Sequence, residues 1–317
     1  MLAVHIECGR VDVREVPLPA RLPGFALIRL LAAGICNTDL ELQRGYYGFS
    51  GTPGHEFVGE VTEADEPALI GRRVVGEINL ACGACDWCRA GLGRHCPHRT
   101  VLGIAGHPGA FSEYFTLPEG NLHIVPDTIS TERATFTEPV AAACEILDQV
   151  AIPRGGEVAV LGDGKLGLLA AQVLLAHRAR VHLYGRHASN LAIAGACGAE
   201  TFANGSLPAS RYHWVVEATG APEGLGAAIR MARPRGTVVM KSTVHGEVPL
   251  DTAPAIVNEI TLVGSRCGRF EPALELLAGD RLRVEEMISD RFPLAGAARA
   301  FERAAAGGVL KVLIQAA

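Results

Sequence analysis

The sequence has no excess of positive charge. Its 317 residues include 29 Lys and Arg against 34 Asp and Glu, a formal net charge of -5 at pH 7. A protein that binds a nucleic-acid backbone needs a basic face, so this balance argues against a nucleic-acid partner. Hydrophobic residues make up 49% and charged residues 20% of the chain, which excludes wholesale disorder. At roughly 150 residues per domain, the length predicts about two domains.

Long hydrophobic runs are also missing. The most apolar helical stretch, residues 166–176, contains Gln172 and is too short to span a bilayer. The first residues include His5, Glu7 and Arg10, so they lack the apolar core of a signal peptide. We therefore expect no membrane partner and a cytoplasmic location. In a reducing compartment, clustered cysteines more often serve metal binding or chemistry than disulfides.

The hydrophobic pattern changes along the chain and divides it into two parts. The first third is predicted to be rich in β-structure, with strand-like segments at 11–16, 25–33, 57–63 and 72–78. Later strand-like segments, at 158–161, 180–184, 214–217, 236–240 and 260–264, alternate with helical ones. This alternation predicts a parallel sheet with helical crossovers. The last fifty residues predict a helix at 271–278, a strand at 311–314 and a helix between them.

Four of the nine cysteines lie within fifteen residues. Cys82, Cys85, Cys88 and Cys96 form a C-x2-C-x2-C-x7-C pattern. Short turns can aim four thiolates at one point about 2.3 Å away, which is the geometry of tetrahedral zinc. Four thiolates fill the coordination shell, so the pattern predicts a structural zinc. Free thiols or an iron–sulfur cluster are the alternatives.

A glycine-rich turn follows the strand-like segment at 158–161 and precedes a helical one, in the pattern G-x-G-x-x-G. The first glycine permits a tight turn, and the second lets the backbone approach a pyrophosphate at the helix N-terminus. The third lets the helix pack closely on the strand. Placed between a strand and a helix, this turn predicts a dinucleotide site. Its expected cofactor-binding residues are Gly162, Asp163, Gly164, Lys165, Leu166 and Gly167.

The second strand of this part ends without an acidic residue. NAD enzymes place Asp or Glu at that position, about 20 residues after the turn, to bind the ribose 2′-OH. Here Gly185 occupies the position, followed by Arg186 and His187. Because Arg186 would attract a 2′-phosphate, we predict a preference for NADP(H) over NAD(H). The alternative is a solvated Arg186 in an ordinary turn, with NAD bound through other contacts.

Three further motifs stand apart in the sequence: GICNTD around Cys36, GHE at His55 and TEP at Glu138. Taken singly, each has an ordinary explanation, because a lone Cys is usually a small buried hydrophobe. Together with the four cysteines and the glycine turn, they occur in one order over nearly the whole chain. In this respect the chain resembles the zinc-dependent medium-chain dehydrogenases, the family of alcohol, sorbitol and threonine dehydrogenases.

The resemblance implies an α/β fold of two domains. Residues 1–139, completed by 267–317, would form a GroES-like β-rich catalytic domain, and residues 140–266 a doubly wound Rossmann domain. It also implies a homodimer or homotetramer that pairs through the strand near 260–264. Substrate would lie in the cleft between the domains. Candidate lining residues, each equally explained by packing, are Tyr46, Tyr47, Phe49, Ile78 and Arg266.

The resemblance further implies a catalytic zinc beside the structural one. Cys36 and His55 would be ligands, and either Glu56 or Glu138 would supply a carboxylate. Asp39 would hold His55 in one tautomer from behind. The choice between the two carboxylates stays open.

Other roles follow from positions in the family pattern. Thr38 would pass the alcohol proton outward, unless it caps the helix that follows. Glu41 stands where many relatives carry a histidine, so the outer part of the proton relay stays open. Positions after later strands add four residues to the cofactor site, namely Thr219, Ser242, Ser265 and Arg266.

These residues predict one reaction. Three protein ligands leave zinc an open position, where it lowers the pKa of a bound alcohol. We therefore expect an oxidoreductase that transfers hydride between an alcohol or polyol, or the matching aldehyde or ketone, and NADP(H). A zinc-independent enone or quinone reductase of the same fold would not need Cys36, His55 or the four cysteines. A non-catalytic nucleotide-binding regulatory protein would not need the intact ligand set. The particular alcohol and the direction stay open.

Overall fold

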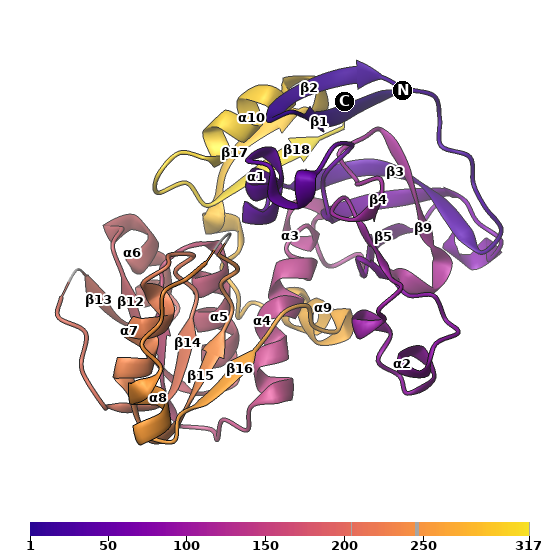
Figure 1. Cartoon of the computed structure of the whole chain (residues 1–317). Coiled ribbons are helices and arrows are strands. Elements are labelled where there is room, and N and C mark those ends of the chain that lie inside the picture. The colour runs from indigo at the N-terminus through magenta and orange to yellow at the C-terminus, as the bar shows by residue number, and fades with distance from the viewer. Residues whose placement is uncertain (204, 245–246, 317) are drawn as a thin grey trace. The chain divides into compact units, whose positions relative to one another are not determined.

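The chain forms two compact units, shown with labelled elements in Figure 1. The computed structural model describes residues 1–203, 205–244 and 247–316. Unit 1 comprises Met1–Glu138 and the residues from Ile288 onward, and unit 2 comprises Pro139–Met287. Among the described residues, no helix is both long and apolar enough to cross a membrane.

Unit 1 consists mainly of β-strands, as predicted for the first third of the chain. Its strands are β1 (Leu2–Glu7), β2 (Arg10–Glu15), β3 (Phe25–Gly34), β4 (Glu56–Glu63), β5 (Arg73–Gly76), β6 (Asn79–Leu80), β7 (Thr100–Leu102), β8 (Gly106–His107), β9 (Tyr114–Pro118), β10 (Leu122–Ile124), β17 (Ile288–Pro293) and β18 (Lys311–Gln315). Its helices are α1 (Asn37–Gln43), α2 (Asp86–Arg89), α3 (Thr131–Ala134) and α10 (Ala297–Ala304), and α4 (Thr137–Gln149) begins at its boundary.

Strand β3 is the centre of the main sheet of unit 1. This sheet has the order β10-β5-β4-β3-β18-β17, and β9 pairs with the first half of β3. Most of β3 is buried, as its run of apolar residues predicts. Its last residue, Gly34, lies opposite Glu56 of β4 on one side and Leu313 of β18 on the other. The end of β3 is therefore the point where segments from distant parts of the chain meet.

Unit 2 is an α/β unit around one parallel sheet. Its strands are β11 (Glu157–Leu161), β12 (Arg180–Gly185), β13 (Glu200–Ala203), β14 (Tyr212–Glu217), β15 (Ala232–Met240) and β16 (Thr261–Gly264). Its helices after α4 are α5 (Lys165–Ala176), α6 (Ala188–Ala196), α7 (Gly224–Met231), α8 (Ala253–Val257) and α9 (Phe270–Ala278).

The strand order of this sheet is β13-β12-β11-β14-β15-β16, with all neighbours parallel. Numbered within the unit this is 3-2-1-4-5-6, the order of a doubly wound dinucleotide-binding fold. The predicted parallel sheet is confirmed. Strand β13 was not predicted, because two of its four residues are polar and none is buried, so the segment gives no apolar run.

The second boundary between the units lies at Met287 rather than near residue 267. Gly268 lies against the backbone of Ala141 at the start of α4. The buried side chain of Gln172 accepts a hydrogen bond from the backbone N–H of Arg283 at 2.6 Å. Segment 267–287 therefore belongs with unit 2. Its helical pattern indicates α9, but a helical pattern does not show which sheet the helix covers.

The contact at Gly268 allows a direct test of this boundary. A methyl group at position 268 would lie 1.9 Å from the carbonyl oxygen of Ala141. We expect Gly268→Ala to lower the free energy of unfolding by about 1–3 kcal/mol, the usual cost of overpacking. The measurement is a urea titration followed by circular dichroism. Gly264→Ala is the control, because nothing lies within 4 Å of a methyl group there; equal losses in both variants would contradict the assignment.

Candidate active site

Three potential metal ligands meet at the end of β3. Cys36 caps the start of α1 directly after β3, and His55 and Glu56 lead into β4. The ligand atoms of these three residues lie within 4.8 Å of one another. His55 and Glu56 are only 3% and 1% exposed. A partly buried thiol beside a buried imidazole and a buried carboxylate suits zinc and leaves a fourth tetrahedral position open.

Asp39 orients this group from the first turn of α1. The Asp39 side chain is fully buried, and its Oδ2 accepts the backbone N–H of Cys36 at 2.8 Å. Its Oδ1 accepts the N–H of Gly54 at 3.2 Å and lies 3.4 Å from Nδ1 of His55. This distance is too long to satisfy Nδ1 fully. Nδ1 faces Asp39, so Nε2 is the nitrogen that a metal ion would bind.

The charge of Asp39 also affects the protonation of His55. Burial is the largest single effect and works to lower the pKa of the His55 imidazole, but the charges and hydrogen bonds of Asp39 and Cys36 together outweigh it. The pKa of His55 is therefore held well above its ordinary value. Metal binding at this imidazole must displace a proton.

Glu56 forms a buried ion pair with Lys311 of β18. The Nζ of Lys311, which is 1% exposed, donates a hydrogen bond to Oε2 of Glu56. Burial works to lower the pKa of the Lys311 ammonium, but the charges of Glu56, Cys36 and Glu138 and the hydrogen bond to Glu56 together outweigh burial and raise that pKa. Lys311 thus stays cationic beside Glu56. A Cβ at Gly34 would lie 2.6 Å from Oε2 of Glu56, so glycine provides the space for the pair.

The structure brings Glu56, and not Glu138, into the group with Cys36 and His55. Glu138 lies in the first turn of α4, and its charge contributes to the raised pKa of Lys311. The hydroxyl of Thr38 lies 3.7 Å from the sulfur of Cys36. The alternative of Thr38 as a helix cap is wrong, because α1 begins earlier and Cys36 occupies the cap position.

Other residues named from the sequence lie near this site or in the core. Glu41 of α1 forms an ion pair with Arg44 at 2.6 Å. Tyr46 and Tyr47 follow α1, with ring centroids 4.1 Å apart, and Tyr47 is exposed. Ile78 is buried, as expected for a residue that packs in the core.

The four clustered cysteines lie close together between β6 and β7. Their sulfur–sulfur distances are 3.5 Å for Cys85–Cys88 and Cys82–Cys96, 3.7 Å for Cys85–Cys96 and 3.9 Å for Cys82–Cys88. Four sulfurs at about 2.3 Å from a tetrahedral zinc are about 3.8 Å apart. The N–H of Ala84 and that of Cys85 lower the pKa of Cys82 to about 6, which favours a thiolate ligand. The set therefore fits a closed metal site.

The glycine turn between β11 and α5 has the geometry that its pattern predicts. Gly162 has a φ of +115°, and a Cβ there would lie 2.4 Å from the Ala218 carbonyl oxygen. A Cβ at Gly167 would lie 1.9 Å from the carbonyl oxygen of Gly162. At Gly164, the cap of α5, nothing lies within 4 Å of a Cβ. The first and third glycines permit close packing, and the second leaves room for a pyrophosphate.

The other predicted cofactor residues follow strands of the same sheet. Carboxyl ends of parallel strands lie at one edge, where α/β sheets bind ligands. Gly185 ends β12, Arg186 follows it and is exposed, and His187 caps α6. The remaining positions also follow strands: Lys165 and Leu166 start α5 after β11, Thr219 follows β14, Ser242 follows β15, and Ser265 and Arg266 follow β16.

Sequence analysis missed Glu217, which organises this edge. Glu217 is the buried last residue of β14. Its Oε1 accepts hydrogen bonds from the Thr219 hydroxyl at 2.6 Å and the Ser242 hydroxyl at 3.0 Å. Its position was a signal in the sequence. An acidic residue directly after two valines of a predicted strand is expected to be buried, and a buried acid needs hydrogen-bond partners.

Sequence analysis also missed Lys241, which follows β15 and fixes a neighbouring loop through hydrogen bonds. It is 7% exposed, and its Nζ donates to the Ser265 hydroxyl at 3.1 Å and to the Arg266 carbonyl at 2.9 Å. A third bond reaches the Ala142 carbonyl at 2.7 Å. Lys241 thus fixes the loop that follows β16.

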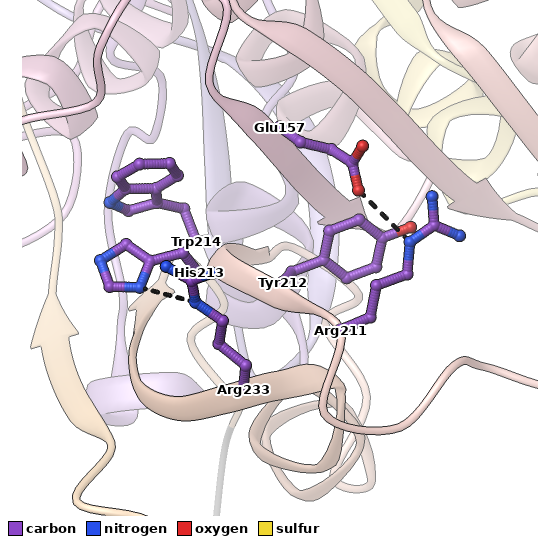
Figure 2. A pocket seen from close by; sticks show the side chains of 6 residues that line it. All are labelled: Glu157, Arg211, Tyr212, His213, Trp214 and Arg233. Atoms are coloured by element: carbon purple, nitrogen blue, oxygen red, sulfur yellow. Dashed lines mark hydrogen bonds and ion pairs between the residues drawn. The ribbon is translucent and has the colours of Figure 1, made fainter.

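A hollow of about 250 Å³ lies at the opposite edge of the sheet, where β11 and β14 begin. Figure 2 shows Arg211 directed at Glu157 and Arg233 at His213, with distances of 3.3 Å and 3.2 Å. The hollow is lined by Glu157, Arg211, Tyr212, His213, Trp214 and Arg233. Because nucleotides bind at the carboxyl edge, the glycine turn and not this hollow is the candidate cofactor site.

Comparisons with known proteins cover both units. The alcohol dehydrogenase GroES-like domain matches residues 22–127, and the zinc-binding dehydrogenase family matches residues 166–279. L-threonine 3-dehydrogenase from Streptomyces avermitilis is 32% identical over 95% of this chain and 94% of its own. D-altritol 5-dehydrogenase from Agrobacterium fabrum is 31% identical over 91% of both chains. The structure of a zinc-binding dehydrogenase from Sinorhizobium meliloti 1021 bound to NADP has 30% identity and a TM-score of 0.91, covering 99% of this chain and 98% of that one.

The two family matches occur in the order that the motifs predict, and the predicted two-domain fold class is confirmed. The chain is an oxidoreductase that acts on CH–OH groups with a nicotinamide cofactor. Relatives above 30% identity extend over nearly its whole length. The chain therefore belongs to the zinc-dependent medium-chain dehydrogenase family.

Proposed function

We propose that this dehydrogenase oxidises a hydroxyl group of a polyol, or reduces the matching carbonyl, at a zinc held by Cys36, His55 and Glu56. The observation that carries the proposal is this donor set, whose ligand atoms lie within 4.8 Å of one another. When bound, zinc would supply the Lewis acidity that lowers the pKa of a substrate hydroxyl. The relative named for D-altritol supports a polyol as substrate.

The residues around the donor set have distinct parts in this reaction. Asp39 keeps Nε2 of His55 available by facing Nδ1. Lys311 holds the Glu56 carboxylate in place beside the other two donors through the buried ion pair. Thr38, whose hydroxyl lies 3.7 Å from the Cys36 sulfur, would accept the proton that leaves the substrate.

The four clustered cysteines would hold a second, structural zinc. On this assignment unit 1 is the catalytic domain and unit 2 the cofactor-binding domain. A zinc-independent enone or quinone reductase would have no use for either donor set.

Loss of single cysteines tests both metal assignments. Cys36→Ala should remove one zinc ion per subunit and abolish turnover while leaving the melting temperature nearly unchanged. Cys88→Ala should also remove one zinc ion but lower stability and expose the cysteine lobe to proteolysis, because a structural metal supplies folding energy. Atomic absorption, calorimetry and limited proteolysis give the measurements. Full activity in Cys36→Ala would disprove the catalytic assignment.

We further propose NADP(H) as the preferred cofactor. Position 185 at the end of β12 carries no acidic side chain, and the exposed Arg186 follows it. An arginine there pairs with a 2′-phosphate and has no matching partner in NAD(H). The relative bound to NADP supports the same cofactor.

Replacing Arg186 tests the cofactor preference. We expect wild-type protein to have the higher kcat/KM with NADP. Arg186→Gln should lower kcat/KM with NADP about tenfold, which corresponds to the loss of one charge-assisted contact. It should leave kcat/KM with NAD nearly unchanged. Arg180→Gln, at the other end of the same strand, serves as control and should change neither value. A wild-type preference for NAD would refute the proposal.

We also propose that the protein is a cytoplasmic homodimer or homotetramer. Among the described residues no two cysteines form a disulfide, which agrees with a reducing compartment. Strand β16 is an outer strand of its sheet and carries the exposed Leu262. The helix before it, α8, exposes Ile256 and Val257 at 72% and 79%. An apolar edge of this kind favours pairing with a second copy.

A charge on this edge should separate the subunits. We expect Leu262→Lys to lower the molar mass measured by light scattering after size-exclusion chromatography. Ile70→Lys, at an exposed apolar position in unit 1, should leave the mass unchanged. If wild-type protein is already a monomer, the interface assignment fails.

A further inference from the structure

The side chain of Asp163 occupies the space at the end of β12 where NAD enzymes carry an acidic residue. A Cβ at Gly185 would lie 2.4 Å from Cβ, 2.5 Å from Cγ and 2.7 Å from Oδ2 of Asp163. Real Cβ atoms do not approach other atoms so closely. A side chain at position 185 and an aspartate at position 163 therefore exclude each other.

The carboxylate of Asp163 is engaged by the protein's own chain. It is 5% exposed, and its Oδ2 accepts the backbone N–H of Arg186 at 2.9 Å and that of His187 at 2.6 Å. The same oxygen lies 3.1 Å from Nδ1 of His187. The Asp163 carbonyl oxygen accepts a bond from the Asn190 side chain at 2.9 Å. These contacts tie the glycine turn to the turn between β12 and α6.

The two basic residues of that turn are held differently. The His187 imidazole lies beside the Asp163 carboxylate, whereas the Arg186 side chain is exposed. No ion pair between described residues involves the Arg186 guanidinium. Asp163 thus fixes the backbone of Arg186 through its N–H while the guanidinium remains available to a ligand.

We propose that Asp163 is a positioning residue for NADP(H). Its carboxylate, engaged by backbone N–H groups, fills the space of a side chain at position 185 and fixes the turn that carries Arg186 and His187, so that Arg186 meets the 2′-phosphate. This inference rests on the proposed cofactor preference. The opposite role, in which Asp163 itself accepts the ribose 2′-OH of NAD(H), is one outcome of the test.

The first experiment measures cofactor binding rather than turnover. Dissociation constants of NADPH and NADH are obtained from nicotinamide fluorescence with the zinc-loaded protein. In Asp163→Asn an amide N–H can face the backbone N–H groups of the turn, so the turn loosens. We expect the constant for NADPH to rise about tenfold and that for NADH less than twofold.

A double variant tests whether Asp163 acts through Arg186. If it does, adding Asp163→Asn to Arg186→Gln should change the NADPH constant less than twofold, because the two changes remove one interaction. Independent, multiplying effects would overturn the proposal. So would an unchanged NADPH-to-NADH ratio in Asp163→Asn, or a selective loss of NADH binding. Tighter binding of NADH than NADPH by wild-type protein would refute the proposed preference alone, and the Asp163→Asn ratio would still decide the positioning role.

Moving the acidic residue from position 163 to position 185 tests whether the two side chains compete for one space. It also provides a test if Asp163→Asn folds poorly. Gly185→Asp alone should lower the melting temperature, because its side chain meets Asp163. The combination of Asp163→Ser and Gly185→Asp keeps the net charge and should restore the melting temperature. It should also shift the NADPH-to-NADH ratio at least about tenfold toward NADH. A Gly185→Asp variant that melts at the wild-type temperature would show that the two side chains do not compete.

Discussion

The buried ion pair between Glu56 and Lys311 is the interaction on which unit 1 depends. Each charge alone would be costly away from water, and removing one partner of such a pair typically costs about 3–5 kcal/mol. The pair joins β4 and β18 on the two sides of β3, and Gly34 leaves the space that it occupies. It also keeps the Glu56 carboxylate beside Cys36 and His55. The proposed zinc site is therefore held together by the same contact that links the two strands beside β3.

Both units contain buried carboxylates that fix the backbone around them. Asp39, Asp163 and Glu217 are all buried and accept backbone N–H groups of their own chain. None is directed at solvent, and each fixes a neighbouring group with a proposed role in metal or cofactor binding. Because a buried carboxylate needs several donors, it orders the loop that supplies them. Rigid loops at the ends of strands are what a site for metal and cofactor requires.

The sequence could predict those features that depend on neighbouring residues. The four cysteines, the glycine turn and most strands and helices have local patterns, and they lie where those patterns place them. The donation from Lys311 to Glu56 joins residues far apart in the chain, and no local pattern indicates it. Local patterns also do not indicate that the Asp163 side chain lies against Gly185 at the end of β12, or that the boundary between the units lies at Met287. Those features follow from the pairing of distant segments, which a single sequence does not display.

The division of the chain into units has a consequence for its synthesis on the ribosome. Unit 2 is one continuous segment, so it has all its residues once position 287 has left the exit tunnel. Unit 1 still lacks β17 and β18 at that time, and Glu56 has no cation beside it. The residues of unit 2 are therefore all available before those of unit 1, and contacts between distant segments of unit 1 can form only when the chain is nearly finished. A chain that ended before Lys311 would lack the cation that pairs with Glu56.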